Sequence, residues 1–205
     1  MDENSANPYT LTDDDRTVIG NTTPKFSGGF GLNATFKGFD VSAFFNFMYD
    51  FDVFNANKVM MTTWASNNYN NFSMDISAAK RWRNFDDMGN EIRYSPEILA
   101  EFNKNATMWN PTSIGRPIAM SYAVEDGSFL RLNTATIGYT LPRAWTNKVG
   151  LSRVRFYASG YNLFTITGYS GYDPEVDIAT GLTPNIDNNR YPRSRTYTFG
   201  VQLTF

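Results

Sequence analysis

The last ten residues of the chain, 196–205, read TYTFGVQLTF and alternate strictly between apolar and neutral polar side chains. Successive side chains of a β-strand point to opposite faces. A strand that crosses a bilayer needs about ten residues, whereas most strands in soluble proteins have about five or six. The segment is therefore predicted to be a membrane-crossing strand. Its apolar face consists of Tyr197, Phe199, Val201, Leu203 and Phe205.

Four earlier segments show a similar alternation, at 26–36, 40–54, 129–141 and 153–167. The pair Lys37-Gly38 separates the first two and predicts a tight hairpin. The connections alternate between short and long, as in outer-membrane barrels, which have short periplasmic turns and long extracellular loops. We therefore expect an all-β fold: five long antiparallel strands that form an open part of a membrane β-barrel. Residues 1–25 would be an extracellular loop, 26–205 the barrel part, and 55–127 and 168–195 its long extracellular loops.

The composition argues against several classes of function. The chain has no histidine and no cysteine, so the commonest general base, thiol nucleophiles and zinc sites are absent. Its net charge of −2 gives no basic footprint for nucleic acid. Without an apolar pocket to raise a carboxyl pKa, we predict no catalytic residues, no cofactor and no metal. The N-terminus lacks the basic and apolar regions of a signal peptide, so we expect the chain to be the tail of a longer exported protein.

Four strings carry a family resemblance: TVIGNTTPKFSGGF at 17–30, VEDGSFLRLNTATIGYTLP at 124–142, SGYNLFTITGYSGYDPEV at 159–176, and NNRYPRSRTYTFGVQLTF at 188–205. In order and spacing they resemble the C-terminal barrel part of SusC/RagA-type TonB-linked outer-membrane transporters. The resemblance implies a 22-stranded barrel with an N-terminal plug, located in the cell outer membrane and driven through the TonB complex.

The same resemblance implies the partners and the cargo. A SusD-like surface lipoprotein would lid the barrel, outer-membrane lipid would surround it, and oligosaccharides or peptides would be taken up. The plug and the residues that contact TonB have no counterpart in this sequence. Phe205 and the apolar residues that alternate with it would then serve as the signal for barrel assembly; otherwise they form an ordinary edge strand.

Other candidates follow from register and composition. Asn33, Asn46 and Asp50, together with Asp52, fall on the polar side of their strands and could line the lumen. Helices are expected within 73–83 and 95–103. In the first long loop, exposed aromatic faces could stack on sugar rings, or they could pack the loop on itself. These aromatic residues are Trp64, Tyr69, Trp82 and Trp109.

Two further alternatives stay open at the level of sequence. The carboxylates of Asp173, Glu175 and Asp177 alternate in a loop, which suits either a calcium site or a solvated turn around Pro174. For the whole chain, a non-coupled structural barrel module and a soluble sugar-binding β-sandwich compete with the transporter interpretation.

Overall fold

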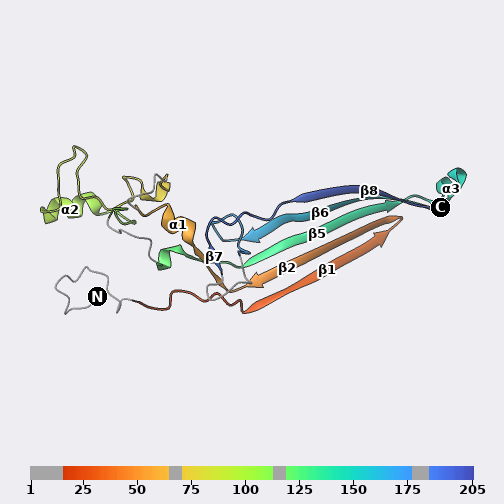
Figure 1. Cartoon of the computed structure of the whole chain (residues 1–205), viewed down its shortest axis with the longest axis horizontal. Helices are drawn as coiled ribbons and strands as arrows, with labels where there is room; N and C mark the ends of the chain where they lie inside the picture. The colour runs from red at the N-terminus through yellow and green to blue at the C-terminus, as the bar shows by residue number, and fades with distance from the viewer. Residues whose placement is uncertain (1–15, 65–70, 113–118, 177–184) are drawn as a thin grey trace.

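The computed structural model describes residues 16–64, 71–112, 119–176 and 185–205. Its main feature is one antiparallel sheet of five strands in the order β1-β2-β5-β6-β8, so strands that follow one another in the chain lie side by side (Figure 1). The strands are β1 (Phe26–Phe36), β2 (Phe39–Tyr49), β5 (Phe129–Thr140), β6 (Arg153–Thr167) and β8 (Thr196–Thr204). The predicted all-β barrel segment is confirmed.

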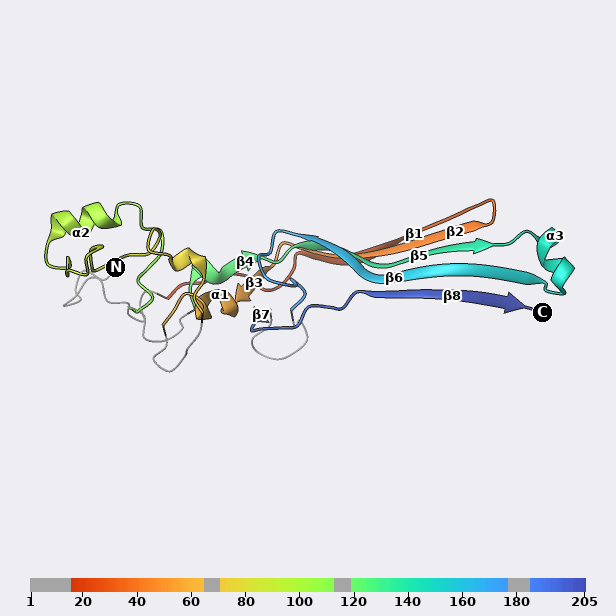
Figure 2. The same ribbon diagram turned by 90° about the horizontal axis from the view of Figure 1, so that it is seen from above.

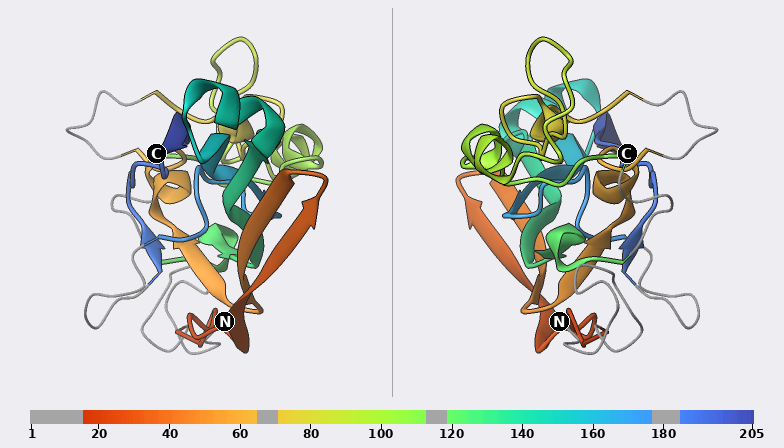
Figure 3. Two further views of the ribbon diagram at one scale, coloured as in Figure 1. Left: turned by 90° about the vertical axis from the view of Figure 1, so that its right-hand side faces the viewer. Right: turned by 90° about the vertical axis from the view of Figure 1, so that its left-hand side faces the viewer.

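The sheet is curved and open. Seen along the strands, β1 and β8 lie at opposite edges (Figure 3), and neither edge strand has a second neighbour among the described residues. The long connections gather at one end, here called the loop end. The β1–β2 hairpin, the short helix α3 (Arg143–Thr146) and the C-terminus lie at the other, the turn end (Figure 2).

The β1–β2 hairpin forms as the sequence predicts. Lys37 and Gly38 both have a positive φ, 47° and 88°, which is the backbone of a type I′ turn. A β-carbon on Gly38 would lie 2.9 Å from the carbonyl oxygen of Thr140. The turn can therefore pack this closely against β5 only because glycine has no side chain.

Two irregularities shift the register within the sheet. Asn133 is an extra residue in β5, and Asn162-Leu163 lies opposite it in β6, where Asn162 has a φ of 52°. Bulges of this kind bend a strand and change which side chains share a face. In β5 the apolar face is carried by odd-numbered residues from Ala135 onward, but by Leu130 and Leu132 before the bulge.

The predicted second strand, 40–54, is not continuous, and this expectation was wrong. β2 ends at Tyr49, Asp50 turns the backbone with a φ of 60°, and the chain starts a new strand, β3 (Asp52–Asn55). With β4 (Val124–Asp126) and β7 (Ile186–Asp187), β3 forms a separate three-stranded sheet in the order β4-β3-β7 at the loop end.

Short helices occupy the connections. The predicted helix at 95–103 is confirmed as α2 (Pro96–Asn103), with Ser95 as its N-cap residue. The prediction at 73–83 was wrong beyond one 3₁₀ turn, η2 (Met74–Ile76), because the following backbone pairs with residues near Met108. The others are α1 (Ala56–Met60), η3 (Ser121–Ala123) and η4 (Asn147–Val149). In the described part of the chain, no helix combines the length and apolarity needed to cross a membrane.

The apolar core lies where the loops meet the sheet. It consists of Phe51, Val53, Phe129, Tyr169 and Val176, with Met48 packed against it. By contrast, most of the large side chains on the apolar face of the sheet are exposed, such as Phe199 at 79%, although Leu132 and Val154 are buried. Among the described residues no second layer covers that face, whereas a β-sandwich would pack a second sheet on it.

Candidate functional site

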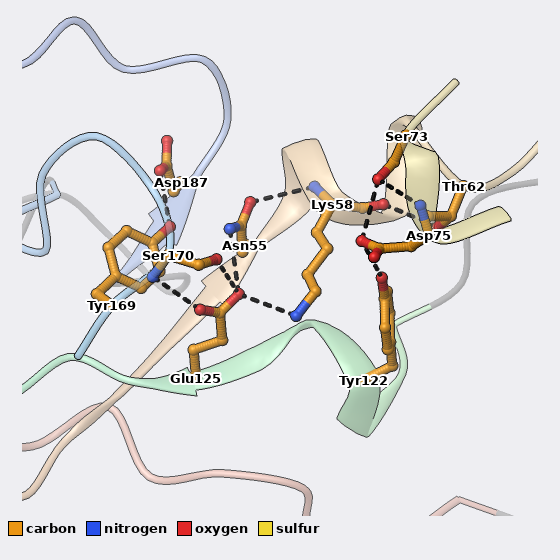
Figure 4. A network of polar contacts seen from close by, with 10 residues as sticks. All are labelled: Asn55, Lys58, Thr62, Ser73, Asp75, Tyr122, Glu125, Tyr169, Ser170 and Asp187. Carbon is orange, nitrogen blue, oxygen red and sulfur yellow. Dashed lines mark hydrogen bonds and ion pairs between the residues drawn. The ribbon is translucent and has the colours of Figure 1, made fainter. Parts of the chain in front are cut away.

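Glu125, in β4, joins three segments at the loop end (Figure 4). Its carboxylate accepts hydrogen bonds from the side chains of Asn55 and Lys58, each at 3.3 Å, and from the backbone N–H and hydroxyl of Ser170, at 2.9 and 2.8 Å. Burial alone would raise the pKa of Glu125, but the bonds from Ser170 and the charge of Lys58 outweigh it and hold the pKa below its usual value. Glu125 thus ties α1 to the start of the second long connection.

A second set of contacts lies on the other side of Lys58 (Figure 4). The ammonium of Lys58 sits 4.4 Å from the ring centre of Tyr122, and the Tyr122 hydroxyl donates to Asp75 at 3.4 Å. Burial and the nearby charge of Asp75 raise the pKa of Tyr122 to about 12, so the phenol stays protonated. Ser73 donates to the same carboxylate at 3.0 Å, which fixes η2 to this group.

Tyr169 extends the network into the third strand of the small sheet. Its hydroxyl donates to Asp187 at 2.7 Å, and the other carboxylate oxygen of Asp187 accepts from the Asn57 side chain at 3.3 Å. Burial, with the Asp187 hydrogen bond next, raises the pKa of the Tyr169 phenol. The two long connections are therefore built as one body. We call these contacts around Glu125, Tyr122 and Asp187 the loop junction.

Arg131 fastens the second long connection to the sheet. Its side chain is 2% exposed, and its guanidinium donates to Asp173 at 2.5 Å and lies 3.6 Å from Glu175. Arg193 donates to Glu175 at 2.7 Å from the other side. Both carboxylates proposed for calcium are thus engaged by arginines, and Asp177 lies outside the described residues. Among the described residues, no group of three or more acidic side chains is arranged to hold a metal ion.

The strings that carry the family resemblance coincide with these contacts. In EDGS, Asp126 accepts from the backbone and hydroxyl of Ser128, at 2.9 and 2.5 Å, and forms a turn. Between them, a β-carbon on Gly127 would lie 2.6 Å from both Phe51 and Val53. Only glycine fits there, so the turn packs directly on the core.

The polar face of the sheet carries a bridge between strands that are not neighbours. Arg155 in β6 donates through Nε to Asp40 in β2 at 2.9 Å, and its Nη2 donates to the other carboxylate oxygen. The pair passes over Gly138 in β5. Beside it, Thr136 and Ser159 share a hydrogen bond of 2.8 Å.

The predicted lumen residues fall in different surroundings. Asn33 is exposed on the polar face of β1, opposite Ser42, and Asn46 is half-buried opposite Arg131. Asp50 lies beyond the end of β2, where strand alternation no longer places it, and it pairs with Lys25 at 2.5 Å. Asp52 is in β3 and accepts from the backbone of Asn21 at 2.7 Å.

The predicted ligand-binding aromatics do not form one cluster in the described part of the chain: no ring contact joins Trp64, Trp82 and Trp109 to one another. Trp109 packs edge-on against Tyr122, with 5.0 Å between ring centres, and donates its indole N–H to Thr62. Trp64 lies against Phe72 at 5.7 Å and is 47% exposed, and Trp82 is 41% exposed. Tyr69 lies outside the described residues.

The predicted assembly signal is accessible. Tyr197, Phe199, Val201 and Leu203 are exposed on one face of β8, and Phe205, one residue past the strand, is 89% exposed.

The loop junction as a unit could not be predicted from the sequence, although residues of the strings that carry the family resemblance take part in it. Glu125, Arg131 and Tyr169 all lie within those strings, but their contacts are made with residues distant in the chain. The sequence held one signal for Arg131. It is a charged residue within the predicted strand 129–141, and the string 159–176 contains carboxylates that could pair with it.

Comparisons with known proteins agree with this architecture. The chain is 32% identical over 197 residues to TonB-dependent receptor P3 of Formosa agariphila, a match that covers 93% of this chain and 17% of that receptor. It is 32% identical over 164 residues to TonB-dependent receptor SusC of Bacteroides thetaiotaomicron, covering 73% of this chain and 15% of SusC. The chain therefore spans less than a fifth of the length of these curated relatives. No family model matches it.

Solved structures give the same result. The RagAB peptide importer superposes on the chain with a TM-score of 0.71 in its closed-closed state and 0.68 in its open-open state. Both matches have 25% sequence identity and cover 96% of this chain and 19% of the matched chain. Sequence and fold together identify the chain as a SusC/RagA-type barrel segment of the TonB-dependent receptors.

Proposed function

We propose that this chain forms part of the wall of an outer-membrane importer that works with the TonB complex. The observation that carries the proposal is the contrast between the two faces of one sheet. The apolar face is uncovered, while the polar face is cross-linked by the Asp40–Arg155 pair and by hydroxyl groups. In a membrane barrel the first face contacts lipid and the second lines a watery interior.

The cargo we propose is an oligosaccharide or a peptide. Similarity to SusC and to a peptide importer supports this range, and the relatives are receptors and transporters rather than enzymes. A SusD-like surface lipoprotein would act as the partner, and contact with TonB would be made by parts that this segment does not contain.

The loop end would face the outside of the cell. Since the loop junction ties both long connections through buried or half-buried polar groups, we infer a pre-formed body at the mouth of the barrel rather than two independent flaps. Such a body offers a fixed surface to a partner lipoprotein or to arriving cargo. Asn33 and Asn46 would face the interior of the barrel.

The test is an uptake measurement on the complete gene product, produced in the outer membrane of a host that lacks related importers. Fluorescent peptides and oligosaccharides are supplied, and accumulation is compared in hosts with and without TonB. We expect accumulation of one cargo class that depends on TonB. Accumulation that is equal without TonB would favour the non-coupled barrel module instead.

A further inference from the structure

A pocket at the loop end has no role in the contacts described so far. It encloses about 240 Å³ and is lined by residues from three parts of the chain: Asn57 and Met60 of α1, the following Met61, then Asn71, and Asn189 just after β7. No charged residue belongs to this described lining. The volume is that of one or two residues of a peptide rather than a large ligand.

One wall of the pocket is held rigidly. The Asn57 side chain donates to Asp187 at 3.3 Å and accepts from the backbone N–H of Asn189 at 2.9 Å. Asn189 itself has a φ of 56°, a left-handed conformation that asparagine tolerates better than most residues. Asp187 is in turn fixed by Tyr169 in the core, so the frame of the pocket is continuous with the loop junction.

The other two amides are available. The side chains of Asn71 and Asn189 are exposed and form no hydrogen bond with any described residue. Each carboxamide offers a carbonyl acceptor and two N–H donors. That is the complement of a peptide group, which presents one C=O and one N–H. Two methionines, Met60 and Met61, also line the pocket, and their flexible side chains adapt to different apolar groups.

From this geometry we infer that the pocket binds an extended, uncharged stretch of peptide. Asn71 and Asn189 would bond its main chain, and Met60 and Met61 would receive one side chain. A sugar ring would instead be expected to stack on an aromatic face, and the described lining contains none. The inference rests on the proposed import function and narrows its cargo to peptides.

The experiment measures equilibrium binding to the complete gene product in outer-membrane vesicles. The probes are a neutral BODIPY-labelled octapeptide library made of Gly, Ala, Ser and Leu, and BODIPY-labelled maltoheptaose. The test variant is Asn71→Ala with Asn189→Gly, because glycine keeps the left-handed backbone and removes only the amide. The matched control is Asn188→Ala, which removes an exposed amide next to the pocket lining.

We expect the double variant to weaken peptide binding about tenfold, as the loss of one or two hydrogen bonds implies, while Asn188→Ala binds like wild type. Equal peptide binding by wild type and double variant would overturn the site. Weakened maltoheptaose binding with unaffected peptide binding would overturn the peptide assignment. Failure of wild type to take up either probe in the TonB-dependent assay would instead refute the proposed function, so the two failures are distinguishable.

Discussion

Asp40 and Arg155 meet across the backbone of Gly138, and so join β2 to β6 over the strand between them. A β-carbon on Gly138 would lie 2.5 Å from Nη2 of Arg155 and 2.6 Å from both carboxylate oxygens of Asp40. The sheet therefore holds a three-strand clamp on its polar face, and glycine is what leaves room for it.

Gly138→Ala should break this clamp. The added methyl group cannot occupy the space of the ion pair, so we expect a loss of about 1–2 kcal/mol in the free energy of unfolding. The measurement is urea unfolding of the folded protein in detergent. Gly31→Ala is the matched control, because its β-carbon would meet nothing closer than 3.7 Å. Equal midpoints for the two variants would show that the pair adds nothing to the sheet.

Phe45→Arg should lower the free energy of unfolding in the membrane much more than Asn33→Arg does. Phe45 lies near the middle of β2 on the apolar face, with its ring 5.0 Å from that of Phe30, whereas Asn33 lies on the polar face of β1, opposite Ser42 and nearer the turn end. Arginine facing the middle of a bilayer costs about 2–4 kcal/mol, and arginine facing the lumen costs little. Equilibrium unfolding of each variant from lipid vesicles measures the two changes in the free energy of unfolding. A penalty at Asn33 as large as that at Phe45 would contradict the assignment of faces.

Acid should release the loop that Arg131 holds. Burial opposes ionisation of Asp173, but hydrogen bonds from Arg131 and from the backbone of Glu175, together with the charge of Arg131, hold the pKa of Asp173 below its usual value. Because the folded pKa is the lower one, the stabilisation is complete above the unfolded pKa of about 3.9 and is lost as pH falls through the folded value. Limited pepsin cleavage after Tyr172 should therefore increase below about pH 4.

Asp173→Asn is the companion variant for this prediction. It leaves Arg131 with the carboxylate of Glu175, at 3.6 Å, so cleavage at Tyr172, divided by the rate at which pepsin cleaves the unfolded chain at the same pH, should be raised and nearly independent of pH. A variant with the wild-type pH profile would show that Asp173 does not hold the loop.

Deletion of Phe205 tests the assembly role of the closing strand. We expect less of the complete gene product in the outer membrane, with synthesis and export across the inner membrane unchanged, since an exposed terminal aromatic contributes little to the fold. Surface protease accessibility measures the amount in the outer membrane, and fractionation measures the amount that is synthesised and exported. Wild-type surface levels would leave β8 as an ordinary edge strand.

The strands could be predicted from the sequence because period-2 alternation is a local property. The bounds of β1 and β6 match the predicted 26–36 and 153–167, and Lys37-Gly38 makes the predicted turn. The break at Asp50 could not be predicted that way, since the alternation continues through Val53. Its cause is non-local: the Asp50 N–H donates to Ser128, and β3 pairs with β4 and β7.

The candidate site, too, could be predicted from the sequence only where it depends on local alternation. Strand register places Asn33 and Asn46 on the polar face, but the loop junction joins residues far apart in the chain, such as Glu125 with Ser170, 45 positions away, and with Asn55, 70 positions away. No local pattern reports such pairs. Likewise, the extra residue Asn133 reverses the face of the residues before it, which simple alternation cannot anticipate.

The central claim, that one face of the sheet meets lipid and the other does not, is tested most directly by quenching in the membrane. The chain has no cysteine, so single cysteines can be placed at Phe45 and Phe199 on the apolar face and at Ser42 and Gln202 on the polar face. Each is labelled with bimane in a cysteine-free form of the complete gene product, in vesicles with brominated lipid. We predict strong quenching at Phe45 and Phe199 and little at Ser42 and Gln202. Equal quenching on both faces, or stronger quenching at Ser42 and Gln202, would contradict the account.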